Sequence, residues 1–367
     1  MRFPEFTKEW EMASLQDIAA VNPKSNPLQN SFVYIDLEAV EKGELRKIQE
    51  VMREEAPSRA QRVIYKNDIL FQCVRPYQKN NYIHKIQSKS NQQWVASTGY
   101  AQIRTTEIPN YIYHLLNTDG FNQKVMVRCT GSSYPAINSE DLATIRFYLT
   151  TDTKEQLKIS RLLDLLDERI ATQNKIIEDL KKLKSAIRKK MFSLLKDEYT
   201  ESFGINQLLD YEQPTAYIVA NDEYSTDTSL TPVLTANKGF ILGYTDEKFG
   251  IYQKGECIIF DDFTMDAKYV SFPFKVKSSA IKILTAKPNV NLRFMFEYLS
   301  YLELKSEEHK RHYISEIASL VVELPSKEMQ NKIASLMASL DNKLALEENT
   351  KVKYEDEKQY QLSQMFI

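Results

Sequence analysis

Cysteine is scarce in this chain, and its placement argues against two common structural devices. The 367 residues include only Cys73, Cys129 and Cys257, which are odd in number and far apart. No two of them form a CxxC pair, so the sequence favours neither a zinc site nor a disulfide framework. We therefore expect three reduced thiols in a cytoplasmic protein.

Long apolar runs are absent as well, which argues against a membrane protein. No stretch reaches the roughly 18–20 apolar residues that cross a bilayer. The first residues, MRFPEFTKEWEMAS, carry charges from Arg2 to Glu11 and no apolar segment, unlike a secretory signal. With 43% hydrophobic and 27% charged residues, the composition is typical of a soluble globular protein, and the length favours two or more domains.

An excess of basic charge is also lacking. The net charge is −2, whereas a domain that binds nucleic acid is usually basic. Residues 1–150 contain 18 Lys/Arg and 16 Asp/Glu, but residues 197–325 contain 12 Lys/Arg and 20 Asp/Glu. Any contact with DNA must therefore depend on local charge, or on basic partners that supply phosphate contacts.

Motifs of catalysis are missing too. Gly239, Gly243 and Gly250 form neither a GxGxxG motif nor a P-loop, so a nucleotide-phosphate cradle is not supported. The Asn/Asp-Pro-Pro-aromatic motif of adenine-N6 methyltransferases does not occur, and there is no glycine-rich cofactor loop. We expect a chain that is not an enzyme and binds no cofactor.

What the sequence does contain is an internal repeat. The stretch KEQLKISRLLDLLDERI begins at Lys154, and EMQNKIASLMASLDNKL begins 174 positions later, at Glu328. A shift of 174 aligns the two stretches without a gap and includes polar residues that a chance match of leucine-rich helices would not explain. The identities include Gln156/Gln330, Lys158/Lys332, Ile159/Ile333, Leu162/Leu336, Leu166/Leu340, Asp167/Asp341 and Met191-Phe192/Met365-Phe366.

Each copy of the repeat predicts a long amphipathic helix. No Pro or Gly interrupts residues 152–203, and apolar residues recur at alternating spacings of three and four. The first stripe includes Ile159, Leu163, Leu166, Ile170, Ile177, Leu180 and Ile187. The second keeps Ile333, Met337, Leu340 and Leu344 and then becomes polar. We expect the two helices to pair in antiparallel fashion; the alternative is that each packs on its own domain.

The regions between the helices also echo each other, which indicates a tandem duplication. EWEMASLQDIAAV corresponds to ESFGINQLLDYEQ, and IYKNDILFQCVRP to IYQKGECIIFDDF. We predict a mixed α/β (α+β) fold, with two globular domains related by a pseudo-twofold axis and separated by two long antiparallel coiled-coil helices. The predicted segments are a first domain, a first helix, a second domain and a second helix, at residues 1–151, 152–196, 197–325 and 326–367.

With this repeat and this order of segments, the chain resembles the DNA specificity subunits of type I restriction–modification systems. The first domain carries the resemblance in RFPEFTKEWE, IYKNDILFQCVRP, STGY and GSSYPAI, and the second half in KGECIIFDDFT and ELPSKEMQNKIASLMASLD. The resemblance covers nearly the whole chain. Two departures occur at the helix starts, where Thr151 stands in place of the usual Pro and Met329 in place of the usual Glu.

The resemblance implies a targeting role. In this family two target-recognition domains read the two halves of a split double-stranded DNA site, and the helices hold two adenine methyltransferase subunits. Methylation uses S-adenosylmethionine in the methyltransferase partner, and cleavage uses ATP and Mg in endonuclease/translocase subunits. The alternative is a two-headed coiled-coil interaction scaffold that does not bind DNA.

Candidate DNA contacts lie in polar loops that follow strand-like runs. Arg can pair with guanine, Asn with adenine and Lys with phosphate. The first-domain candidates are Arg75, Tyr77, Lys79, Asn80, Asn81, Ser132, Ser133 and Tyr134. The second-domain candidates are Lys238, Tyr244, Lys248, His309, Lys310, Arg311 and Tyr313. An ordinary solvated surface loop is the alternative interpretation of each.

A cluster of acids in FDDFTMDAKY allows a further hypothesis. Asp261, Asp262 and Asp266 would be carboxylates close enough together to bind Mg²⁺ in a nuclease. No Glu/Lys nuclease pattern follows them, so we favour turn-forming residues. His309 and His312 have no nearby Cys or His ligands, so we expect no metal site there either.

Overall fold

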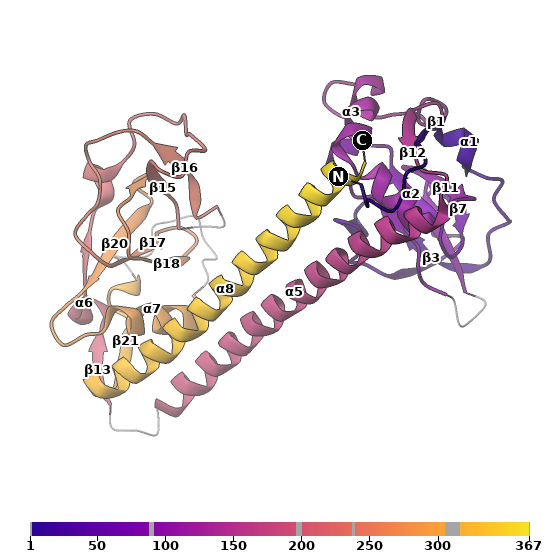
Figure 1. Cartoon of the computed structure of the whole chain (residues 1–367). Helices are drawn as coiled ribbons and strands as arrows, with labels where there is room; N and C mark the ends of the chain where they lie inside the picture. Colours follow the sequence, from indigo (N-terminus) through magenta and orange to yellow (C-terminus); the bar gives the residue numbers. More distant parts are fainter. Residues whose placement is uncertain (1, 88–91, 196–199, 237–238, 305–315, 367) are drawn as a thin grey trace. The chain divides into compact units, whose positions relative to one another are not determined.

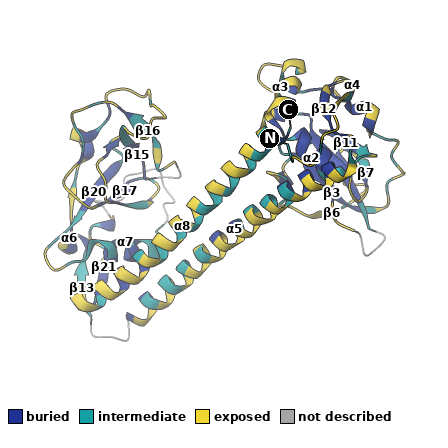
Figure 2. Ribbon diagram, viewed as in Figure 1, coloured by how far each residue is buried: buried dark blue, intermediate teal, exposed yellow. Residues whose placement is uncertain are grey.

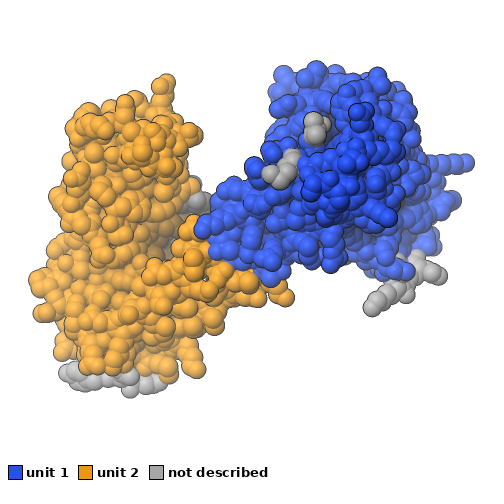
Figure 3. Space-filling view, in the orientation of Figure 1, with its two compact units in different colours: residues 1–174, 350–367 blue, residues 175–349 orange. Residues whose placement is uncertain are grey.

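Two compact units make up the computed structural model (Figures 1 and 3). Unit 1 contains residues 1–174 and 350–367, and unit 2 contains residues 175–349. Each unit therefore includes a globular domain together with part of both long helices. The structure describes residues 2–87, 92–195, 200–236, 239–304 and 316–366. The segment boundaries expected above, which separate helices from domains, stay a prediction.

Unit 1 is built on two four-stranded sheets and a two-stranded ribbon. The sheets have strand orders β2-β11-β8-β9 and β6-β3-β10-β7, and the ribbon pairs β1 with β12. The bounds are β1 (Glu11–Ser14), β2 (Ala19–Val21), β3 (Ser31–Ile35), β6 (Gln49–Met52), β7 (Ala60–Ile64), β8 (Ile69–Gln72), β9 (Tyr82–Ile83), β10 (Gln93–Ser97), β11 (Tyr100–Thr105) and β12 (Arg146–Leu149). A small hairpin joins β4 (Val40–Glu41) to β5 (Glu44–Leu45).

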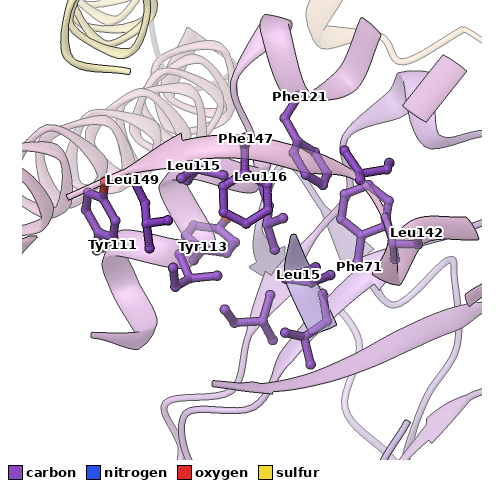
Figure 4. Packing of buried hydrophobic residues seen from close by; sticks show 14 of the residues in the cluster. Leu15, Phe71, Tyr111, Tyr113, Leu115, Leu116, Phe121, Leu142, Phe147 and Leu149 are labelled. Atoms are coloured by element: carbon purple, nitrogen blue, oxygen red, sulfur yellow. The ribbon is translucent and has the colours of Figure 1, made fainter. Parts of the chain in front are cut away.

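Short helices cover the β2-β11-β8-β9 sheet. They are α1 (Leu15–Ile18), α2 (Pro109–Leu116), α3 (Asp119–Arg128) and α4 (Ser139–Ala143), with a 3-10 turn η1 (Pro76–Gln78). Pro109 occupies the first position of α2, where its missing N–H costs nothing. Thr118 caps α3 by accepting a hydrogen bond from the Phe121 amide. The core between sheet and helices is aromatic, and Phe71, Phe121 and Phe147 lie together there (Figure 4).

In its described residues, unit 2 repeats this plan with fewer strands. Its sheets have orders β14-β20-β17-β18 and β16-β15-β19, and its ribbon pairs β13 with β21. The bounds are β13 (Glu201–Gly204), β14 (Leu209–Glu212), β15 (Thr231–Leu234), β16 (Ile241–Thr245), β17 (Cys257–Asp261), β18 (Ala267–Val270), β19 (Lys275–Val276), β20 (Ile281–Ala286) and β21 (Val321–Leu324). The helices are α6 (Ile205–Leu208) and α7 (Leu292–Tyr301), with a 3-10 turn η3 (Pro214–Tyr217).

All but one of the strand pairings in the three main sheets of unit 1 have a counterpart in unit 2, which confirms the duplication that the sequence predicts. The ribbon β1–β12 corresponds to β13–β21, and the order β2-β11-β8-β9 corresponds to β14-β20-β17-β18. Each second sheet contains one parallel pair, β3 with β10 and β15 with β19. The second copy has no described counterpart of β7, which pairs with β10 in unit 1.

The two long helices are α5 (Thr153–Leu194) and α8 (Lys327–Met365), and both contribute to each unit. In unit 1, Lys358 Nζ lies 2.5 Å from Asp167 Oδ1. In unit 2, Lys184 Nζ lies 2.5 Å from Asp341 Oδ1. A shift of 174 converts the first pair into the second, so the repeat aligns the partners as well as the helices. Arg169 with Tyr354, and Lys181 with Glu348, give the same antiparallel direction.

The apolar stripes of α5 and α8 are buried mainly where each helix begins. Ile159 and Leu163 pack in the core of unit 1 together with Leu362 and Met365 from the end of α8. Ile333 and Met337 pack in the core of unit 2, and Leu340 and Ile187 pack against that core. Leu166, Ile170, Leu180 and Leu344 are half-buried and Ile177 is buried. The stripes thus serve helix pairing and domain packing together, so the two interpretations of the sequence both apply.

Exposure along the helices differs from exposure in the sheets. Figure 2 shows strands that are largely buried, whereas α5 and α8 are mostly intermediate or exposed. Among the described residues no helix has the length and apolar character needed to cross a bilayer.

Candidate nucleic-acid interface

The first candidate loop leaves the edge of a buried strand and turns sharply. Strand β8 ends at Gln72, and Arg75 then adopts a left-handed backbone conformation with φ of 54°. Lys79, on the other side of η1, does the same with φ of 50°. Left-handed backbone at residues other than glycine is uncommon and requires support from the surroundings. Here the support comes from the side chain of Gln72.

Gln72 is buried and holds both ends of the turn. Its Nε2 donates to the Val74 carbonyl at 2.8 Å and to Gln78 Oε1 at 2.9 Å, and its Oε1 accepts from the Asn80 amide at 3.1 Å. Its own amide donates to Asn81 Oδ1 at 2.8 Å. Sequence reasoning missed Gln72 because it belongs to a strand-like apolar run, DILFQCV, and a single polar residue in such a run does not show what it bonds.

The second candidate loop of unit 1 joins the first to form one surface. Val74 and Ala136 form an antiparallel bridge, and the Arg75 amide donates to the Pro135 carbonyl at 2.8 Å. The guanidinium carbon of Arg75 lies 4.3 Å from the centre of the Tyr134 ring. Two stretches that the sequence suggested separately are therefore brought together as one patch, which we name the Arg75–Tyr134 surface and which includes Tyr77.

Exposure divides the unit 1 candidates into two groups. Tyr134 is 64% exposed and Tyr77 is 50% exposed, and Ser132 and Ser133 are also exposed. Asn81, in contrast, is only 2% exposed, and it donates to Asn117 Oδ1 at 3.1 Å. The position of Asn81 gives it a part in holding the loop, whereas the aromatic side chains and Arg75 present polar and π surface of the kind that contacts nucleic acid.

The remaining two candidates of unit 1 are tied to neighbouring segments. Lys79 Nζ lies 2.5 Å from Asp119 Oδ1 and 3.2 Å from the Asn117 carbonyl, at the start of α3. Asn80 Oδ1 accepts from the Lys42 amide at 3.0 Å, in the β4–β5 turn. These contacts fix the loop between two other segments of unit 1, so it has a defined shape.

In unit 2 the candidates Tyr244 and Lys248 lie near a loop that a buried lysine holds in place. Tyr244, in β16, is half-buried, and Lys248 is exposed beside Phe249, which is 68% exposed. The fully buried Lys275 Nζ lies 2.7 Å from Glu247 Oε2 and donates to the Phe249 carbonyl at 2.8 Å. The hydrogen bond from Lys275 to the Glu247 carboxylate lowers the pKa of Glu247.

The turn that follows Phe249 requires a glycine. Gly250 has a φ of +58°, and a Cβ there would stand 2.5 Å from the Ala216 carbonyl oxygen. The anchored backbone therefore presents Lys248 and Phe249 to solvent. The candidates Lys238, His309, Lys310, Arg311 and Tyr313 lie outside the described residues.

The acidic cluster has a structural role in the described residues. Asp261 Oδ1 accepts hydrogen bonds from the amides of Phe263 and Thr264, both at 2.9 Å. Asp262 is buried and its Oδ2 lies 3.3 Å from Lys282 Nζ. Asp261 thus shapes a turn and Asp262 belongs to a buried ion pair, as in the turn-forming interpretation. Within the part of the chain that the structure describes, no group of three or more His, Cys, Asp or Glu side chains is arranged to hold a metal.

Comparison with known proteins decides which family these features belong to. The family model of the type I restriction modification DNA specificity domain matches residues 7–182 and again residues 200–355. The chain belongs to this specificity family. The two matches correspond to the two copies of the internal repeat, and they confirm the resemblance and the two-domain fold that the sequence predicts.

Relatives of this specificity family agree. The chain is 39% identical over 153 residues to the specificity subunit of the type I restriction enzyme EcoR124I/EcoR124II from Escherichia coli. That match spans 40% of this chain and 38% of the relative, which is less than half of each.

Two solved structures share the fold over the whole chain. The S subunit of the type I restriction-modification system of M. genitalium is 14% identical, covers 100% of this chain and 99% of its own, and has a TM-score of 0.63. A chain from a type I R-M system, solved to explain complex assembly and conformational transition, is 18% identical, covers 98% of each chain and has a TM-score of 0.59. At these identities the likeness concerns the fold.

Proposed function

We propose that this chain is the non-catalytic DNA specificity subunit of a type I restriction–modification complex. Its two domains would read the two halves of a bipartite double-stranded site, and α5 and α8 would recruit two adenine-N6 methyltransferase subunits. The observation that carries the proposal is the match of the specificity domain to each copy of a duplicated chain. Methylation and cleavage would be carried by the partners, with S-adenosylmethionine in the methyltransferase and ATP and Mg in the endonuclease.

The Arg75–Tyr134 surface supports the proposal at the level of side chains. A guanidinium stacked on an exposed tyrosine offers hydrogen-bond donors and a π face at the same place. In unit 2, exposed Lys248 and Phe249 offer a cation and an aromatic ring together. The second domain is acidic, so we expect the partners to supply most phosphate contacts there.

The test is the methylation pattern of DNA. The chain is co-expressed with its cognate methyltransferase subunit in a host that lacks other adenine methylation, and the host DNA is read by methylation-sensitive long-read sequencing. We expect N6-methyladenine at one motif with two separated halves. An assembled complex that leaves no bipartite modified motif would contradict the proposal.

The acidic second domain keeps one alternative in view, a scaffold that binds only proteins. The two functions differ in salt dependence, because phosphate contacts release counterions when DNA binds. The affinity of the assembled complex for a duplex is therefore measured between 50 and 200 mM salt, values at which a protein with several phosphate contacts loses roughly three orders of magnitude. A complex with no measurable duplex affinity at the lower salt concentration would favour the scaffold.

A further inference from the structure

The two recognition domains are seated on the long helices through equivalent helices. Gln156 and Gln330 are aligned by the shift of 174, and each accepts a backbone hydrogen bond that marks where the domain helix begins. Gln156 Oε1 accepts from the Ile108 amide at 3.2 Å, and Gln330 Oε1 accepts from the Asn291 amide at 2.9 Å. Helix α2 of unit 1 therefore corresponds to α7 of unit 2.

This correspondence places different side chains at the same two positions. Two residues after Ile108 stands Asn110, and two residues after Asn291 stands Arg293. Six residues after the same markers stand His114 and Glu297. Both pairs lie one helical turn apart, so each pair projects from one face of its helix. That face meets α5 or α8.

In unit 1 the pair meets a carboxylate. His114 is fully buried, and its Nε2 lies 2.9 Å from Asp164 Oδ1. The Asn110 amide donates to the other oxygen of the same carboxylate. We call Asp164, together with the positions Asp167, Lys358 and Leu362, the first seat. The Asp164 carboxylate of this seat gives hydrogen-bond partners to the neutral polar side chains of α2.

In unit 2 the pair meets cations. Glu297 is fully buried, and its Oε2 lies 2.7 Å from Arg188 Nη2 and 2.8 Å from Arg188 Nε. Lys184 Nζ lies 3.5 Å from the other oxygen of Glu297. Arg293 pairs with Asp341, which also binds Lys184. The positions of this second seat are Ala338, Asp341, Lys184 and Arg188.

The shift of 174 shows that the seats differ at two of their four positions. Asp167 corresponds to Asp341, and Lys184 to Lys358, so one ion pair is common to both seats. The position of Asp164 is occupied by Ala338 in the second seat. The position of Arg188 is occupied by Leu362 in the first seat. Asp164 contacts both differing residues of α2, and Arg188 contacts Glu297 of α7.

We propose that these two differences between the seats determine, through their charges, which domain each seat accepts. If a helix with Arg and Glu at the two positions lay in the first seat, its glutamate would face the Asp164 carboxylate. The first seat would offer that glutamate Leu362 in place of Arg188. A helix with Asn and His in the second seat would leave Arg188 without the Glu297 carboxylate and Lys184 with Asp341 as its remaining partner. In each case a buried or half-buried charge loses one of its partners, which is strongly destabilising. The domains are therefore not interchangeable between positions, whatever the proposed DNA function proves to be.

The test replaces the differing residues of unit 2 with those of unit 1, in the full-length chain. The half-exchange variant Arg293→Asn/Glu297→His carries the α2 pair on the unaltered second seat. The full exchange adds Ala338→Asp and Arg188→Leu, which reproduces the first seat. Hydrogen exchange with mass spectrometry measures the opening of residues 292–301, with residues 109–116 as an internal reference. We expect the half-exchange to open residues 292–301 at least about 100-fold more often and the full exchange to recover most of that loss.

A single-residue pair keeps the proposal testable if the multiple variants fail to fold. Glu297→Gln removes the buried charge and keeps the shape, and it should raise exchange in residues 292–301 by a similar factor. Glu303→Gln is the matched control. Glu303 is 58% exposed and pairs with Lys189 of α5, the helix that also carries Arg188. Equal behaviour of Glu297→Gln and Glu303→Gln would overturn the proposal. So would a full exchange no better protected than the half-exchange.

Discussion

At the residue scale, the Arg75–Tyr134 surface shows how one buried side chain prepares others for contact. Gln72 makes hydrogen bonds to four neighbours in the turn, so the loop is fixed before any ligand arrives. A preorganised loop loses less conformational entropy on binding than a loose one. Tyr77 and Tyr134, which are exposed, and Arg75, which is half-buried, are the ones we expect to meet DNA.

We predict that Arg75→Gln weakens specific DNA binding by the assembled complex. Loss of a bidentate base contact costs about 1–3 kcal/mol, so affinity should fall about 5- to 150-fold, and preference should relax at one base pair. The measurement is a duplex-binding titration over a set of single-base variants of the site. Arg53→Gln is the control, because Arg53 is exposed in unit 1 and bonds the Leu28 carbonyl. An equal loss for both variants would contradict a specific role for Arg75.

A second residue-scale prediction concerns pH. His84 is buried against Trp94, with ring centres 4.9 Å apart, and burial lowers its pKa to about 4. In the unfolded chain the pKa is about 6.5. As pH falls below that value the unfolded state gains a proton that folded His84 does not bind, so stability decreases from pH 6.5 towards pH 4.

Between pH 7 and pH 5 the expected loss from His84 is about 2 kcal/mol of unfolding free energy. Urea titrations at the two pH values measure it, and His84→Gln should show the smaller difference. His114, whose pKa burial also lowers, is present in both chains and contributes equally. A difference between pH 7 and pH 5 that is the same for both chains would contradict the assignment.

At the element scale, the repeated glutamine and the closing phenylalanine join each long helix to its domains. Gln156 Nε2 donates to the Thr150 carbonyl at 2.7 Å, and Gln330 Nε2 donates to the Pro325 carbonyl at 2.9 Å. Phe366 packs on Tyr111 with ring centres 5.3 Å apart, and Phe192 packs on Phe294 at 5.4 Å. The glutamine and phenylalanine identities in the repeat are therefore contacts with the domains, whereas the aspartate identity joins the two helices.

We predict that Gln156→Ala and Gln330→Ala each destabilise only their own unit. Each removes the partner of a backbone amide and of a carbonyl at a buried joint, which costs about 1–3 kcal/mol. Hydrogen exchange should rise in residues 108–116 for the first variant and in residues 291–301 for the second. Gln123→Ala, on the exposed face of α3, is the control and should change neither. A rise in both segments for either variant would contradict the local role.

At the scale of the whole molecule, duplication has produced two units with the same topology and different surfaces. The first domain is close to neutral, whereas residues 197–325 carry 12 Lys/Arg and 20 Asp/Glu. The shared scaffold keeps the helix pairing and the ribbons, and the differences gather in loops and in the two seats.

We predict that exchange of residues 1–150 for a first domain from another family member changes one half of the methylated motif and leaves the other half as it was. The donor should carry Asn and His at the positions of Asn110 and His114, so that the first seat is satisfied. Long-read sequencing of methylated DNA reads the result. A motif that changes in both halves, in an assembled complex, would contradict independent recognition by the two domains.

The sequence alone was enough to predict the repeat, the presence of two long helices and the family, because periodicity and self-similarity can be read without knowing which distant residues meet. It also indicated the two loops of unit 1. The contacts of the folded chain were needed to show that these loops form one surface, that Asn81 is buried, and that His114 and Glu297 occupy equivalent positions. Those facts depend on contacts between residues far apart in the chain, such as Glu297 with Arg188, and no spacing in the sequence specifies which distant partner a polar side chain meets.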